Sequence, residues 1–491
     1  MNQNPVINEL KKREAFKRLI NLILSGVSLV LEVLLFTYFY LEHFYPSMQV
    51  VIELNYWFNG YLLQIGVYGT LLYFFSHMYG GLRIGFLRNT EIIFSQIFAT
   101  LIVNVFIYAQ MSLMVTNLFY PWQFVMMTLV QIVTIIIWIS LANQIYQKIF
   151  PPRKLLLIHG DRPIEDIRRK FESRKDKYDI VNCMNIRKGI GYLKKEIMRG
   201  YEAGEYSAVV IWDVTVEERN ALLKYCYAHS IRFYIMPKIS DVILLGAEEL
   251  HMFDTPILLT REYSMTMEQR FVKRMIDIVC SLILLVAASP FMLLTAIAIK
   301  AYDRGPILYK QIRCTQGGRE FYIMKFRSMR TDAEKDGVAR LAQKNDDRIT
   351  PVGHFIRKVR LDELPQLINI LKGDMSFIGP RPERPEIIAQ YVEIMPEFAF
   401  RMKVKAGLAG YAQVYGKYNT TPYDKLKLDL TYIENYSIWL DIKLMLLTLK
   451  ILFWPDSTEG VESEQVTAFK EEHLKRRQKM EKDEQDKHEE E

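Results

Sequence analysis

Two adjacent carboxylates, Asp362 and Glu363, stand at the start of an apolar amphipathic segment that continues to Asn369. Acidic residues in the first turn of a helix favour its dipole, so a purely structural role is one reading. Basic side chains precede the pair at Arg357, Lys358 and Arg360. Carboxylates beside several cations ionise readily, which suits either a Mg²⁺ ligand or a nucleophile.

Further cations gather in the sequence around this pair. They lie in three short segments, Lys310–Arg313, Lys325–Met329 and Gly379–Glu383. Guanidinium forks match the oxygens of a diphosphate in charge and in geometry. The residue types therefore predict a site that handles a diphosphate, with Asp362 and Glu363 doing the chemistry.

The elements that position this site begin with a membrane region. The 491-residue chain has a net charge of +7 and a mean hydropathy of +0.01, but the average conceals long uncharged stretches. Four apolar stretches, 19–41, 56–80, 92–115 and 120–147, are each long enough to cross a hydrocarbon core of about 30 Å as a helix. We therefore predict a four-span transmembrane region over residues 1–150, and the first stretch is too long for a cleaved signal peptide.

Charges in the loops predict the orientation of these spans. Basic residues cluster before the first span, in the 81–91 loop and after residue 148, whereas the opposite loops carry Glu42 and Glu53 or nothing. The positive-inside rule places the basic segments, and everything after residue 148, in the cytoplasm. Glu32 lies in mid-span, where we favour a structural, protonated and hydrogen-bonded carboxyl over a functional one.

Residues 151–262 have the alternating strands and helices of a small Rossmann-like α/β domain. Buried strands are expected at 154–158, 208–212 and 231–236, with helices at 162–174 and 216–229. The turn after the first strand, 159–163, lacks the glycines that let a pyrophosphate approach a helix. A scaffolding, dimerising or regulatory module is favoured over a dinucleotide-binding one.

A fifth apolar stretch, 278–299, has basic residues at both flanks, and Ser289-Pro290 interrupts it. Proline breaks a helix, and neither flank prefers the outer face. We therefore predict a re-entrant helix-break-helix over 273–300 rather than a crossing helix. The segment 436–454 is expected to lie in the membrane interface, and the tail 456–491 to be a solvated charged segment. The four cysteines are too dispersed for a zinc site or a disulfide framework.

Residues from about 271 to 454 resemble the catalytic domain of the bacterial sugar transferases, the polyprenyl-phosphate glycosyl-1-phosphate transferases. The resemblance rests on an ordered series of short motifs: Lys273-Arg-x-x-Asp277, Ser289-Pro290, Gly305–Arg313, Lys325–Met329, Asp347–Thr350, Leu361–Gln366, Leu371–Ser376, Gly379–Pro382 and Asp429-x-x-Tyr432. One loop departs from the family pattern, because Lys405-Ala406-Gly407 and Ala409-Gly410 replace the usual Lys-Pro-Gly and Thr-Gly. The donor preference of the family is therefore not carried over to this chain on the basis of this loop.

The resemblance implies an enzyme that transfers sugar-1-phosphate from a nucleoside diphosphate sugar, such as a UDP-sugar, to undecaprenyl phosphate. UMP would be released in this initiating step of exopolysaccharide, capsule or O-antigen synthesis. Asp362 would be the nucleophile that forms a covalent phosphosugar, and Glu363, with Asp362, would bind Mg²⁺. The residues expected to bind substrate are Arg313, Lys325, Arg327, Arg357, Arg381 and, in a weaker role, Asp429.

The architecture implied is a polytopic anchor, the α/β middle domain and a monotopic catalytic domain over 263–455, in a bacterial cytoplasmic membrane with the catalytic domain on the cytoplasmic face. A homodimer through the middle domain is a possible assembly, and no nucleic-acid partner is expected. Two alternatives stay open: a membrane scaffold of a polysaccharide assembly complex that has lost catalysis, and a transporter built on the N-terminal spans. The near absence of ionisable residues within those spans disfavours the transporter.

Overall fold

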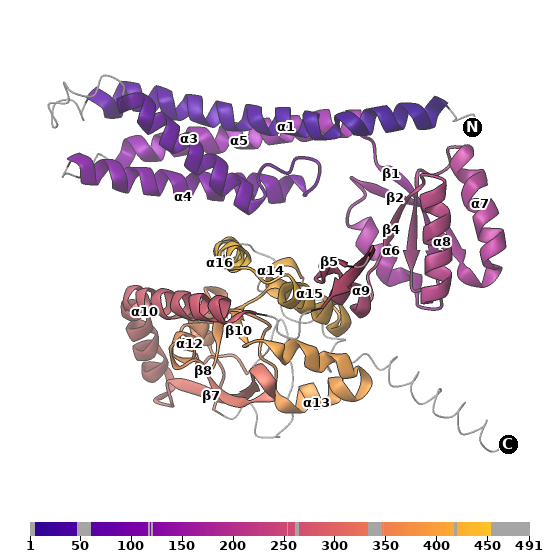
Figure 1. The fold of residues 1–491 in the computed structure, drawn as a ribbon. Coiled ribbons are helices and arrows are strands. Elements are labelled where there is room, and N and C mark those ends of the chain that lie inside the picture. The colour runs from indigo at the N-terminus through magenta and orange to yellow at the C-terminus, as the bar shows by residue number, and fades with distance from the viewer. Residues whose placement is uncertain are drawn as a thin grey trace, which may run out of the picture. The chain divides into compact units, whose positions relative to one another are not determined.

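The structure is a computed structural model that describes residues 5–46, 60–115, 118, 121–252, 254–260, 265–331, 346, 348–416 and 420–452 (Figure 1). These residues divide into two compact units, Met1–Pro237 and Lys238–Glu491. The predicted charged tail 456–491 and Asp347 lie outside the described residues.

Long helices form the first part of unit one. They are α1 (Pro5–Phe39), which continues into a π-helical turn (Tyr40–Phe44), α3 (Gly60–Tyr79), α4 (Asn89–Val115) and α5 (Pro121–Ile149). Four helices of the described residues are long and apolar enough to cross a membrane. They cover Phe16–Phe44, Asn89–Met114, Pro121–Ile149 and Met267–Asp303. The set differs from the predicted spans, because α3 is helical where a span was expected but carries polar residues such as Gln64 and His77.

Polar side chains are buried within this helical region. Gln131 Nε2 donates to the hydroxyl of Tyr68 (2.7 Å), and Asn104 Nδ2 donates to Gln131 Oε1 (2.8 Å). Glu32 is also buried, and its Oε2 has no hydrogen-bond partner in the described part of the chain. Among the described residues, the hydrogen-bond partner expected for the Glu32 carboxyl is thus not found for its Oε2.

A four-stranded parallel sheet of α/β character forms the second part of unit one. Its strands are β1 (Arg153–His159), β2 (Tyr178–Asn185), β3 (Ala208–Trp212) and β4 (Arg232–Ile235), in the order β2-β1-β3-β4. The accompanying helices are α6 (Ile164–Glu172), η2 (Ile186–Lys188), α7 (Ile190–Glu202) and α8 (Val216–Ala228). Strand β2 and helix α7 were not predicted from the sequence.

The carboxyl ends of β1 and β3 are closed by the chain itself. A Cβ on Gly160 would clash with the carbonyl oxygen of Asp213, so the two backbones leave no room there. The Asp213 carboxylate accepts a hydrogen bond from the backbone N–H of Arg162 (2.9 Å) and pairs with its guanidinium (3.0 Å). Since ligands of parallel sheets bind at this edge, the arrangement disfavours a dinucleotide site.

Unit two contains short strands among helices. Its elements are α9 (Ile239–Leu245), β5 (Glu248–Met252), β6 (Thr255–Leu259), α10 (Met267–Asp303), β7 (Leu308–Cys314), η3 (Gln316–Gly318), β8 (Glu320–Phe326), α11 (Pro351–Lys358), η4 (Leu361–Glu363), α12 (Gln366–Lys372), β9 (Ser376–Ile378), α13 (Pro385–Ile394), η5 (Pro396–Lys403), β10 (Gly407–Ala409), α14 (Tyr411–Tyr415), α15 (Pro422–Glu434) and α16 (Ile438–Leu452). The pairs β5/β6 and β7/β8 are antiparallel, and β9/β10 is parallel. One core includes Phe321, Ile370, Met375, Leu426 and Leu444.

Helix α10 contains Pro290 and changes direction part-way along its length (Figure 1). A straight helix of its 37 residues would be about 55 Å long. Both of its ends instead bind the same small body: Arg274 donates to the carbonyls of Ile370 and Leu371 (2.6 Å each), and Asp303 pairs with Arg327. The Ser289 hydroxyl donates to the carbonyl of Val286 (2.8 Å), next to the break.

A buried polar cluster attaches the first half of α10 to the rest of unit two. Lys273 Nζ lies 2.6 Å from Asp441 Oδ2 of α16 and donates to the carbonyl of Ile378 (3.0 Å). The hydroxyl of Tyr432 donates to the other Asp441 oxygen (2.8 Å). Asp277, one turn beyond Lys273, accepts hydrogen bonds from the Ser376 hydroxyl and the Phe377 N–H. The motif Lys273-Arg-x-x-Asp277 therefore joins α10 to β9 and α16.

Candidate active site

The two carboxylates lie in the turn η4, between α11 and α12. The N-cap of helix α11 is Thr350, whose hydroxyl accepts from the Gly353 N–H (2.9 Å), and Pro351 takes the first helical position. The helix ends at Lys358, two residues before Arg360, which has a left-handed backbone with φ of 59°. This conformation reverses the chain, and because non-glycine residues seldom adopt it, it marks the approach to the site as constrained. The predicted helix start is thus a 3₁₀ turn that precedes α12.

Glu363 is held by cations. Its Oε1 accepts hydrogen bonds from Lys325 Nζ and Arg381 Nη2, both at 2.9 Å, and its Oε2 lies 4.0 Å from Arg360 Nη1. Burial would raise the pKa of this carboxyl, but the charges of Lys325, Arg381 and Arg360 outweigh burial and hold the pKa well below its usual range. Glu363 is therefore a fixed anion.

Asp362 has a different environment from its neighbour. No hydrogen bond or ion pair reaches its carboxylate from the residues that the structure describes. Burial, together with the charge of Glu363, raises the pKa of Asp362 to about 6, although Lys325, Arg357 and Arg360 partly oppose this. Of the two carboxyls, the one without a partner among the described residues is thus the one whose charge is least stabilised, as suits a nucleophile.

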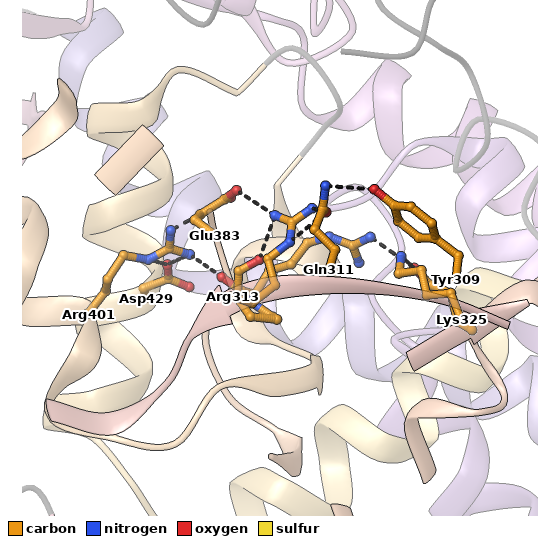
Figure 2. Close-up of polar contacts among 10 residues, drawn as sticks. Tyr309, Gln311, Arg313, Lys325, Glu383, Arg401 and Asp429 are labelled. Carbon is orange, nitrogen blue, oxygen red and sulfur yellow. Dashed lines mark hydrogen bonds and ion pairs between the residues drawn. The ribbon is translucent and has the colours of Figure 1, made fainter. Parts of the chain in front are cut away.

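Polar side chains line the face of β7 that adjoins Lys325 (Figure 2). Gln311 Nε2 donates to the Tyr309 hydroxyl (2.9 Å), and Arg313 donates to Gln311 Oε1 through Nε (3.1 Å) and Nη2 (2.6 Å). Tyr309 is the cross-strand partner of Lys325. Because side chains of a strand alternate between faces, Tyr309, Gln311 and Arg313 share the face on which Lys325 lies.

At the far end of this row lies a buried group of charges. Arg313 Nη1 lies 3.5 Å from Glu383, and Arg401 Nη1 lies 3.7 Å from the other oxygen of the same carboxylate. Arg401 also pairs with Asp429 at 2.9 Å, and both of these side chains are almost fully buried. Figure 2 shows Arg401, Asp429 and Glu383 together at one end of the row.

The predicted site residues therefore fall into separate groups. Lys325 and Arg381 contact Glu363 directly, and Arg357 is close enough to affect Asp362 electrostatically. Arg313 and Asp429 belong to the neighbouring charge group. Arg327 and Ser289 make their contacts at α10. Arg327 pairs with Asp303, and Gly305 packs against the Arg327 guanidinium. Ser289 donates to a carbonyl within α10.

Sequence reasoning assigned no role to three residues of this region, Gln311, Glu383 and Arg401, and named Arg360 only as a neighbouring cation. Gln311 and Glu383 were inside segments already singled out, and the two-residue period of β7 could have placed Gln311 with Arg313. Arg401 had no signal, because its 3₁₀ segment comes near the site only through tertiary packing.

The loop that departs from the family pattern contacts Thr315 and pairs with β9. The backbone N–H of Ala406 donates to the Thr315 hydroxyl (3.1 Å), a bond that a proline at this position could not make. Ala409 pairs with Ile378 in the β9/β10 sheet. The first departure thus gains a hydrogen bond.

The Asp362–Glu363 pair, here called the dyad, is suited to a Mg²⁺ ion that is shared with substrate phosphates rather than to a metal held by protein alone. Among the described residues, no three His, Cys, Asp or Glu side chains gather as ligands. Mg²⁺ in phosphate sites uses one or two carboxylates and completes its shell with substrate phosphates and water. The free carboxylate of Asp362 and the Oε2 of Glu363 fit that requirement.

Residues 268–455 match the family model described as bacterial sugar transferase. A UDP-glucose:undecaprenyl-phosphate glucose-1-phosphate transferase of Caulobacter vibrioides is 40% identical over 190 residues, which are 38% of this chain and 71% of that protein. The chain belongs to the bacterial sugar transferase family. This confirms the resemblance that the motifs indicated.

Other members of this family extend the comparison. A UDP-N-acetylgalactosamine-undecaprenyl-phosphate N-acetylgalactosaminephosphotransferase of Aeromonas hydrophila is 43% identical over 185 residues, 37% of this chain and 44% of that protein. An undecaprenyl-phosphate galactose phosphotransferase of Salmonella typhimurium is 33% identical over 272 residues, 52% of this chain and 56% of that protein. The matched region thus spans about half the length of these two relatives.

Proposed function

We propose that this protein transfers sugar-1-phosphate from a nucleoside diphosphate sugar, a UDP-sugar by analogy with the names of its relatives, to undecaprenyl phosphate. The products are undecaprenyl-diphosphate-sugar and UMP, in the step that initiates a surface polysaccharide. The observation that carries the proposal is the pair itself: Asp362 without a partner in the described chain, next to Glu363 fixed by Lys325 and Arg381. A scaffold without catalysis would not need this arrangement.

In the first half of the proposed reaction, an Asp362 carboxylate oxygen attacks the β-phosphorus of the donor. The bond between that phosphorus and the bridging oxygen breaks, and UMP leaves with the electron pair. In the second half, a phosphate oxygen of undecaprenyl phosphate attacks the same phosphorus, and the Asp362 carboxylate is released. The covalent step divides one transfer between two weakly nucleophilic phosphates into two displacements.

Cations supply most of the catalysis, because charge on the transferring phosphoryl group must be neutralised. Lys325, Arg357 and Arg381 surround the dyad and are suited to that role. Glu363 and Asp362 would hold Mg²⁺, which when bound neutralises the diphosphate charge. Arg313, Arg327 and Asp429 stay as predicted substrate-binding residues, although their contacts in the structure go to other parts of the protein.

The lipid substrate must reach the dyad at the membrane surface. We propose that α10 enters the inner leaflet and returns at Ser289-Pro290, in a bacterial cytoplasmic membrane with the catalytic body on the cytoplasmic face. The change of direction in α10 and the attachment of both of its ends to one body support this (Figure 1). The side chains near the break, including Val286, Phe291 and Leu293, are exposed and apolar. A homodimer through the α/β sheet domain is proposed on the family resemblance alone.

The proposed function is tested by Asp362→Asn in a membrane extract supplied with undecaprenyl phosphate and a panel of nucleotide sugars. Release of nucleoside monophosphate is expected from the wild type and not from the variant, because an amide is a far poorer nucleophile. Asp374→Asn is the matched control, since Asp374 pairs with Arg319, and it should retain activity. Wild-type turnover in Asp362→Asn would remove Asp362 as the nucleophile, and an inactive wild type would favour the scaffold.

A further inference from the structure

The loop Pro380–Glu383 carries Arg381 to the dyad, and every carbonyl in it accepts a hydrogen bond. The carbonyl of Pro380 accepts from the Gly407 N–H (2.9 Å), and that of Glu383 accepts from the Cys314 N–H (3.0 Å). The two carbonyls between them accept from side chains: Arg381 from Arg401 Nη2 (3.0 Å), and Pro382 from Arg313 Nη1 (3.2 Å). Two prolines fix φ on either side of Arg381, so its backbone has little freedom.

Arg401 is itself held firmly. It forms a forked interaction with Asp429, with Nε at 3.1 Å and Nη2 at 2.9 Å from Oδ2, and its guanidinium lies 4.9 Å from the ring centre of Phe398. Glu383 bridges Arg401 and Arg313, so the two guanidinium groups that hold the loop are joined through a residue of the loop. Among the interactions that the described residues make, none joins Arg401 to Asp362 or Glu363.

We propose that Arg401 is a positioning residue for the transfer reaction: together with Asp429 it fixes the backbone of Arg381, so that the Arg381 guanidinium stays on Glu363. This inference rests on the proposed function and assigns a role to a residue outside the dyad. The physical basis is preorganisation, because a guanidinium on a fixed backbone loses less freedom when it stabilises the transition state. Arg313 contributes the second contact to the same loop.

A double-mutant cycle tests the mechanism. Arg401→Lys keeps a charge for Asp429 but lacks the fork that also reaches the Arg381 carbonyl, and we expect it to lower kcat/KM roughly 10-fold or more, as small displacements at a catalytic site do. Arg381→Ala lowers kcat/KM by about 100-fold or more if Arg381 neutralises developing charge. Because Arg401 acts through Arg381, Arg401→Lys is expected to have no further effect in the Arg381→Ala background. Independent, multiplying effects would overturn the proposal.

A second readout separates positioning from a general loss of stability. A loosened Arg381 weakens stabilisation of the transition state, so Arg401→Lys is expected to lower kcat while the KM for the nucleotide sugar stays unchanged. A variant that is only less stable would instead lose activity in parallel with its fraction of folded protein. A loss of activity that matches the loss of folded protein, with kcat per folded enzyme unchanged, would also contradict the proposal.

Controls keep the outcome interpretable. Arg319→Gln removes another arginine–carboxylate pair of the same unit, Arg319–Asp374, and should leave kcat/KM unchanged. If Arg401→Lys does not fold, the pair is replaced as a pair by Arg401→Met with Asp429→Leu, since apolar replacement of both partners of a buried pair is tolerated better than loss of one. That double variant should likewise lower kcat/KM in the wild-type background and have no further effect in the Arg381→Ala background. Wild-type turnover and its loss in Asp362→Asn are measured in the same assay. An inactive wild type would overturn the proposed function, and this inference with it. Multiplying effects of the Arg401 and Arg381 variants in an active enzyme would overturn this inference alone.

Discussion

Asp362 and Glu363 are neighbours in the chain, yet their surroundings divide the work between them. Glu363 accepts from Lys325 and Arg381, whereas no hydrogen bond or ion pair in the described chain reaches Asp362. Carboxylate pairs whose environments separate their pKa values are typical of acid, base and nucleophile assignments. The pair therefore has one fixed anion and one carboxyl available for bond formation.

This difference predicts the pH dependence of the reaction. With the pKa of Asp362 raised to about 6, the proposed nucleophile is ionised above that pH and is lost to protonation as the pH falls through it. We expect kcat/KM to fall on the acid side with an inflection near 6, measured as monophosphate release between about pH 5 and pH 8. An inflection below about pH 4.5, where an ordinary aspartate titrates, would contradict this account.

Lys325 gives a related prediction at the same scale. Its ammonium favours the ionised form of both carboxylates, so Lys325→Gln should raise both pKa values and move the acid limb to higher pH. Activity should also fall about 10-fold or more near neutral pH, because a cation beside the reacting phosphate is lost. Lys310→Gln, on the opposite face of the same hairpin, is the matched control. An unmoved limb in Lys325→Gln would show that another group controls it.

At this scale the residue types alone grouped Asp362, Glu363, Lys325 and Arg381, and in the structure Lys325 and Arg381 contact Glu363. Arg313 and Asp429 were assigned to substrate, but their contacts in the structure are with Glu383 and Arg401. Sequence spacing does not contain the information on which carboxylate an arginine will pair with, since that choice is made by tertiary packing.

Among the elements, α10 and α16 are joined by a buried ion pair. Lys273 and Asp441 are each less than a tenth exposed, and Tyr432 and the Ile378 carbonyl complete the group. Removing one partner leaves a buried charge uncompensated. The cluster thus keeps the apolar helix in register with the catalytic body.

We expect Lys273→Met to lower the free energy of unfolding by about 3–5 kcal/mol, and Lys273→Met with Asp441→Leu to recover much of that loss. The measurement is denaturant unfolding of the purified protein in detergent. The exposed Lys358→Met serves as control and should change stability by less than about 0.5 kcal/mol. Equal destabilisation by the single and the double variant would mean that packing, and not the uncompensated charge, sets the cost.

Element types were predictable where periodicity was strong. The apolar helices and strands β1 and β3 lie where the sequence indicated them. Strand β2 was missed because polar residues such as Asp179 and Asn182 interrupt its apolar pattern in a half-buried position. The cluster around Asp441 was missed for a different reason, since a single acid in an apolar segment does not reveal the lysine 168 residues away that it binds.

For the whole molecule, the path of α10 decides whether the two polar parts of the chain share a compartment. A crossing helix would put the segment after Arg304 on the opposite side of the membrane from the segment before Lys273. Both ends of α10 bind one compact body. This attachment supports the proposed re-entrant path.

Cysteine accessibility in intact cells tests the topology. We expect Ser289→Cys and Arg304→Cys to resist a membrane-impermeant thiol reagent, and Arg304→Cys to react after permeabilisation. Glu42→Cys is the positive control, because the charge distribution predicts that its loop faces outward. Labelling of Arg304→Cys from outside would show a crossing helix.

Helix α3 has a consequence for how the protein is made. Among the described residues it is not one of the helices that meet the criteria for crossing a membrane, and its Gln64 and Tyr68 form hydrogen bonds with Gln110 and Asn104 of α4. If α3 entered the membrane without α4, these polar groups would be exposed to lipid at a cost in free energy. Hydrogen bonds with α4 remove that cost. Burial of the polar groups of α3 therefore requires α4 beside it, and we expect the two helices to fold as a pair.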